Sequence, residues 1–122
     1  MWIYEKKLQY PVKVSKCDPM MAKFLMEQYG GADGELAAAL RYLNQRYTIP
    51  DRVIGLLTDI GTEEFAHLEM IATMVYKLTK DADVEQLKAA GLGAHYAAHD
   101  KALWYENASG VPWTASYIQA KG

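Results

Sequence analysis

Three ionisable residues lie at positions where a helix would otherwise present an apolar face. Glu64 follows Leu57 by seven residues and precedes His67 by three, so both side chains share a helix face with the apolar residues around them. In the preceding segment, Glu35 stands beside Leu36 at the edge of a second apolar face. We therefore expect all three ionisable side chains to point into a helical bundle.

Side chains of these types, when buried together, could bind metal ions. Two carboxylates and an imidazole buried without partners would cost free energy, and cations offset that cost by neutralising the charge. Carboxylate oxygen with imidazole nitrogen suits manganese or iron better than metals that prefer thiolates. Di-iron and di-manganese bundles take a Glu from each of two helices and a Glu-x-x-His from each of two others. Glu35, Glu64 and His67 form half of that set, and we predict them as metal ligands and catalytic residues.

Other interpretations of these positions stay open. A lone Glu-x-x-His also occurs by chance on the surface of ordinary helices. Glu63 is a rival ligand because it lies four residues before His67, but it departs from the centre of the apolar face by about 100°. We prefer Glu64 as the ligand and place Glu63 beside it. His95 and His99 are four residues apart, yet no glutamate adjoins His95 to complete a zinc-protease signature, so a structural role is favoured for both.

Two predicted helices, at about 18–47 and 50–80, carry the ligand candidates. In the first, Leu36, Leu40, Leu43 and Tyr47 recur at helical spacing, and the Gly30-Gly31 pair should break the helix near residues 30–31. Proline disfavours a helical residue before it but suits the first turn of a helix, so Pro50 should separate the two. The sequence therefore predicts a helical hairpin.

The flanking segments lack a long helical pattern. Residues 1–16 alternate apolar and polar side chains around Pro11 and predict an extended arm. Residues 81–122 predict an irregular connection, with a short helix after Asp83 that stops at Gly91 and another around residues 94–105. We expect one all-α domain over residues 1–122, a helical hairpin that forms half of a four-helix bundle.

Composition excludes several classes of partner. The formal net charge is −2, from 13 basic and 15 acidic residues dispersed along the chain, so no basic face for nucleic acid is expected. A single cysteine, Cys17, allows no internal disulfide and suits a reducing compartment. The first residues do not resemble a secretory signal and no segment is apolar enough to cross a membrane, so a cytoplasmic location is expected.

Three stretches of the sequence resemble one known family. LQYP, EQYGGADGELAAALRYLNQRY and DIGTEEFAHLEMIATMVYKL are similar to manganese catalases, particularly their short spore-coat relatives, and the likeness covers essentially the whole chain. The resemblance implies a ferritin-like fold in which Glu35, Glu64 and His67 are the first three protein ligands of a dinuclear manganese cofactor. It also implies that Tyr42 hydrogen-bonds a ligating carboxylate and fixes its orientation.

The implied activity is the disproportionation of hydrogen peroxide to water and oxygen. Two alternatives remain: a structural spore-coat assembly protein with little or no catalysis, and ferritin-like iron oxidation, with iron as the metal. The spore coat is accordingly a second possible location.

The resemblance also implies features that these 122 residues do not contain. The family continues into two more helices that bear another Glu and another Glu-x-x-His. We expect a second copy to supply the missing half of the site, so that two Glu35, two Glu64 and two His67 meet about a two-fold axis. The other explanation is that the chain is a fragment. Calcium, which some members bind through two aspartates one turn apart, is not expected, because Asp59 has Gly55 as its counterpart.

Overall fold

The computed structural model describes residues 3–92 and residues 107, 109 and 111. Within these residues the chain forms helices and contains no strand, which confirms the all-α prediction. The elements are α1 (Pro19–Gly30), α2 (Glu35–Gln45), a short 3₁₀ helix η1 (Asp51–Val53), α3 (Ile54–Thr79) and α4 (Val84–Ala89). The predicted helix around residues 94–105, with His95 and His99, lies outside the described residues.

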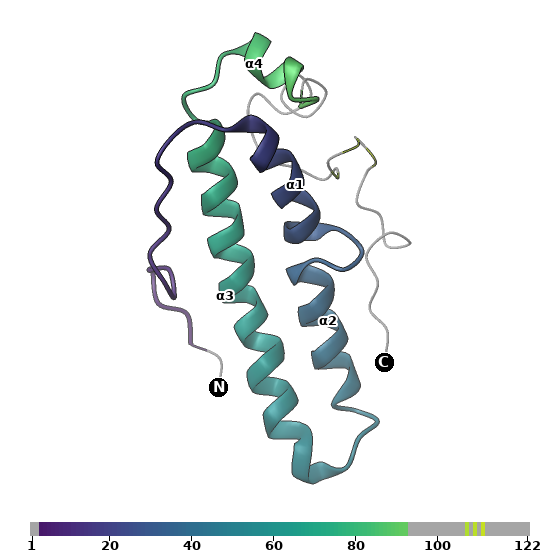
Figure 1. Cartoon of the computed structure of the whole chain (residues 1–122). Helices are drawn as coiled ribbons and strands as arrows, with labels where there is room; N and C mark the ends of the chain where they lie inside the picture. The colour runs from purple at the N-terminus through teal and green to yellow at the C-terminus, as the bar shows by residue number, and fades with distance from the viewer. Residues whose placement is uncertain (1–2, 93–106, 108, 110, 112–122) are drawn as a thin grey trace.

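Helix α3 is the axis of the fold. Helices α1 and α2 follow one another along one side of α3, with the opposite chain direction, and so form the predicted hairpin (Figure 1). The extended arm runs along α3 as well (Figure 1). Tyr4 Oη donates to Glu69 Oε2 at 2.5 Å, and Lys77 Nζ donates to the carbonyl oxygen of Val12 at 2.5 Å. The arm is therefore held on α3 at points distant in the sequence.

A tight turn separates α1 from α2 beside the predicted break. The N–H of Gly31 donates to the Glu27 carbonyl at 2.9 Å, and the N–H of Gly34 donates to the Gly31 carbonyl at 3.0 Å. A Cβ atom at Gly34 would lie 2.6 Å from the Glu27 carbonyl oxygen, closer than side-chain carbons can approach. Glycine is therefore required where the turn folds back on the last turn of α1.

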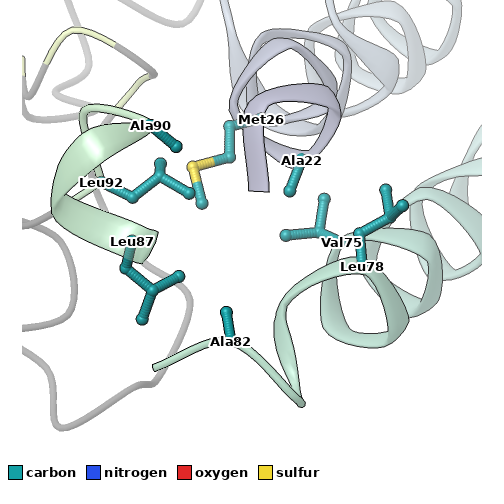
Figure 2. Packing of buried hydrophobic residues seen from close by; sticks show 8 residues of the cluster. All are labelled: Ala22, Met26, Val75, Leu78, Ala82, Leu87, Ala90 and Leu92. Carbon is teal, nitrogen blue, oxygen red and sulfur yellow. The ribbon is translucent and has the colours of Figure 1, made fainter. Parts of the chain in front are cut away.

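The buried apolar core lies at one end of the hairpin, where α1 begins and α3 ends. Asp18 caps α1 by accepting from the N–H of Met21, and its own N–H donates to the Leu78 carbonyl. Helix α4 closes this end, with a reciprocal capping box between Asp83 and Gln86. Figure 2 shows the core cluster, which comprises Ala22, Met26, Val75, Leu78, Ala82, Leu87, Ala90 and Leu92.

Small residues bring α2 close to the middle of α3. Ala37 and Ala39 of α2 are fully buried. Gly61 of α3 faces Leu43 of α2, and a Cβ atom at Gly61 would lie 2.7 Å from Leu43 Cγ. This close approach is what allows side chains from both helices to meet one turn further along α3. Among the described residues, no helix is long and apolar enough to span a membrane.

Candidate metal centre

Helices α2 and α3 bring the three predicted ligands together. One donor atom from each of Glu35, Glu64 and His67 can be chosen so that all lie within 4.8 Å of one another. His67 Nδ1 is 2.6 Å from Glu64 Oε2 and 3.4 Å from Glu35 Oε2. The side chains thus converge, although Glu35 of α2 lies 29 residues before Glu64 of α3 in the sequence.

The local structure explains this convergence. Glu35 is the first residue of α2, where the positive end of the helix favours a carboxylate. Glu64 and His67 are one turn apart on α3, and Gly61 lies one turn before Glu64 on the same face. Since Gly61 lets α2 approach α3, the carboxylate of Glu35 reaches the other two side chains.

The two carboxylates are largely shielded from solvent, and the imidazole is more open. The exposed fraction of the side chain is 16% for Glu35, 13% for Glu64 and 39% for His67. His67 is therefore the most solvent-accessible of the three side chains.

The three groups change one another's protonation. Burial and the hydrogen bond shared with Glu35 raise the pKa of Glu64, despite the opposing effect of His67. Burial alone would raise the pKa of Glu35, but hydrogen bonds with Glu64 and Gln28 and the charge of His67 lower it below its ordinary value. Burial opposes charge on His67, yet the hydrogen bond to Glu64 and both carboxylate charges raise its pKa overall. Glu64 and His67 therefore hold their protons to higher pH than isolated side chains do, and a cation would compete with those protons.

The donor set fits manganese or iron. Two carboxylates and one imidazole offer hard oxygen and intermediate nitrogen atoms, and no thiol joins the cluster among the described residues. Octahedral manganese takes about six ligands, so three protein donors leave positions for further protein groups or solvent. The arrangement is thus suited to one half of a larger site.

Two further residues, Glu63 and Tyr42, are predicted to lie near the three ligand candidates. Glu63 is exposed and its Oε1 accepts a hydrogen bond from Gln9 Nε2 of the arm at 2.8 Å, so its side chain lies with the arm. Tyr42 is half-buried on α2, and the structure records no hydrogen bond from it to the three ligand candidates within the described part of the chain. Its predicted role in orienting a ligating carboxylate stays a prediction.

A cavity of about 700 Å³ lies between the arm and α3. Its walls include Tyr4, Leu8, Phe65, Leu68 and Glu69, and none of the three ligand candidates lines it. This cavity is therefore separate from the candidate metal centre.

Sequence reasoning missed Gln28 of α1. Its Nε2 donates to Glu35 Oε1 at 3.0 Å. Seven residues separate the pair, so helical spacing along a single helix gave no reason to place the two side chains in contact. The glycines between Gln28 and Glu35, which indicate a turn, were the sequence feature that could have suggested the contact.

Comparison with known proteins identifies the family. A family model described as "Manganese containing catalase" matches residues 1–122. The chain is 84% identical to "Protein CotJC" of Bacillus subtilis (strain 168) over 122 residues, which are 100% of this chain and 65% of that protein. It is 36% identical to a "Manganese catalase" of Bacillus subtilis over 136 aligned positions, which cover 100% of this chain and 50% of that protein.

A solved structure shows the same fold. The manganese catalase KatB from Anabaena matches with a TM-score of 0.82 and 33% sequence identity, over 100% of this chain and 55% of that one. The likeness confirms the predicted ferritin-like fold class. The chain thus spans between about half and two thirds of the length of these relatives. With a family model that matches from the first residue to the last, this chain belongs to the manganese-containing catalase family.

Proposed function

We propose that Glu35, Glu64 and His67 are ligands of a dinuclear manganese centre that disproportionates hydrogen peroxide to water and oxygen. The observation that carries the proposal is the convergence of these three side chains within 4.8 Å, with both carboxylates largely buried. Membership in the manganese-containing catalase family supports the choice of metal and reaction.

The residues of this chain would hold and neutralise the metal. Manganese, when bound, supplies the two-electron oxidation and reduction that peroxide disproportionation needs. Glu35 and Glu64 contribute two negative charges in a partly buried site, where they offset the charge of a cation more strongly than in water. His67 lies on the more exposed side, with Nδ1 directed at the carboxylates. The contact between Glu64 Oε2 and His67 Nδ1, at 2.6 Å, would give way when these atoms bind a cation, which requires their deprotonated forms.

The remaining ligands must come from outside the described hairpin. We infer that a second copy of the chain supplies them, because large apolar side chains remain exposed and would be covered by association. The alternative is a further segment of a longer chain. The exposed large hydrophobic residues on α1, α2 and α3 are Met20, Met21, Phe24, Leu40, Leu56 and Tyr76.

Oxygen evolution tests the proposed reaction. Protein loaded with manganese should release oxygen from hydrogen peroxide, and Glu64→Ala, which removes a ligand, should abolish that release. Equal oxygen evolution by the two proteins, or none from either, would contradict the proposal.

Two other functions use the same fold. A structural role in the spore coat is the first alternative, because the relatives named manganese catalase are only 35–37% identical, whereas the 84% identical relative is named "Protein CotJC". Iron oxidation would use the same carboxylate and imidazole donors. Elemental analysis of protein purified without added metal separates them: iron without manganese indicates the oxidase, and no bound metal indicates the structural role. We also propose a cytoplasmic location for the protein, with the spore coat as the alternative.

A further inference from the structure

Glu35 divides its two carboxylate oxygens between different partners. Oε1 accepts the hydrogen bond from Gln28 Nε2 at 3.0 Å. Oε2 lies 3.4 Å from His67 Nδ1. The amide of Gln28 and the imidazole of His67 therefore contact different oxygens of the same carboxylate.

The turn between α1 and α2 creates this contact. In an unbroken helix, residues seven apart would be separated by about 10.5 Å along the axis. Here the turn lies directly on the end of α1, because a Cβ atom at Gly34 would be 2.6 Å from the Glu27 carbonyl oxygen and 2.8 Å from that of Gln28. Glu35, the first residue of α2, consequently lies beside the last turn of α1. The glycines are what allow the amide to reach the carboxylate.

We propose that Gln28 is a positioning residue for the metal centre, holding Glu35 Oε1 so that Oε2 stays directed at Glu64 and His67. The inference rests on the proposed metal site. A free glutamate side chain samples several rotamers, and a donor fixed on a neighbouring helix selects one of them before metal arrives. The partner must be a hydrogen-bond donor, since an ionised carboxylate offers acceptors alone, and the Gln28 amide supplies an N–H.

Manganese binding isotherms measure this role without reference to activity. Free Mn²⁺, followed by its electron paramagnetic resonance signal, gives the affinity of the whole protein and of two variants, Gln28→Ala and Gln28→Met. Methionine keeps the length of the side chain and removes the donor. Both variants should bind manganese about tenfold more weakly, because loss of a partner that orients a ligand typically costs 10–100-fold in affinity.

Gln45→Ala is the matched control. Gln45 is the last residue of α2, and its side chain makes no recorded hydrogen bond in the described part of the chain. This variant should bind manganese as the unmodified protein does. The thermal midpoint of each metal-free variant shows whether the fold is intact.

The outcomes separate this inference from the proposed function. Weaker binding by both Gln28 variants, with unchanged metal-free midpoints, supports the positioning role. Affinities within twofold of the unmodified protein overturn it and leave the metal site standing, as does a loss of affinity matched by a lower metal-free midpoint. If the unmodified protein fails to bind manganese, or Glu64→Ala binds it equally well, the proposed metal site itself is wrong.

Discussion

At the level of single residues, protons would compete with a metal ion for Glu64 and His67. Glu64 and His67 both have raised pKa values, Glu64 through burial and its hydrogen bond with Glu35, and His67 through Glu64 and Glu35 despite its burial. Their protonated forms therefore persist to higher pH than in isolated side chains. Metal ligation requires the deprotonated forms.

Manganese affinity should accordingly fall as the pH is lowered. Each proton displaced on binding changes the affinity by about tenfold per pH unit once the pH is below the pKa of that group. Isothermal titration between about pH 7 and about pH 5, the range in which histidine charges, should show a progressively weaker interaction. The same affinity throughout that range would contradict ligation by Glu64 and His67.

The spacing of Glu64 and His67 could be predicted because both lie on one helix, where sequence separation fixes the relative direction of side chains. Glu35 could be predicted as inward-facing from the apolar residues beside it. Gln28 could not, because its contact with Glu35 depends on the path of the turn at Gly31 and Gly34 rather than on any periodicity. The hydrogen bond from Gln9 of the arm to Glu63 could not be predicted either, because it depends on where the arm lies on α3.

At the level of elements, the contact between α2 and α3 aligns the site. Gly61 permits that contact because its lack of a side chain leaves room for Leu43. The structure shows that the residue opposite Gly61 is Leu43. Such a pairing between helices depends on how the hairpin closes and does not follow from either helix alone.

Gly61→Ala should therefore destabilise the hairpin. Its Cβ atom would lie 2.7 Å from Leu43 Cγ, so side chains or helices must shift, which typically costs about 1–3 kcal/mol. Gly55→Ala is the matched control on the same helix, because a Cβ atom there meets nothing within 4 Å. That change should stabilise the helix by up to about 1 kcal/mol. Urea unfolding of the metal-free proteins measures both, and equal shifts in the two variants would contradict the packing described for Gly61.

At the level of the whole molecule, the two ends of the hairpin differ. The end closed by α4 contains the buried cluster around Val75 and Leu87. Toward the other end, Leu57 and Ile60 of α3 are only half-buried and Leu56 is exposed. Apolar periodicity predicted which face of α3 would be buried. How deeply each residue of that face is buried depends on neighbouring elements, and at this end the hairpin does not provide them. The candidate metal centre, Glu35, Glu64 and His67, lies where α2 meets α3 and matches half of a di-metal ligand set.

Native mass spectrometry of the manganese-loaded protein tests the central claim most directly, since it reports assembly size and metal content together. If Glu35, Glu64 and His67 form a half-site completed by a second copy, the protein will be an even-numbered assembly with one manganese ion per chain. Glu64→Ala will lose the manganese. A monomer that retains no manganese, or a variant that retains it in full, would contradict the claim that these three side chains form a metal centre between two copies.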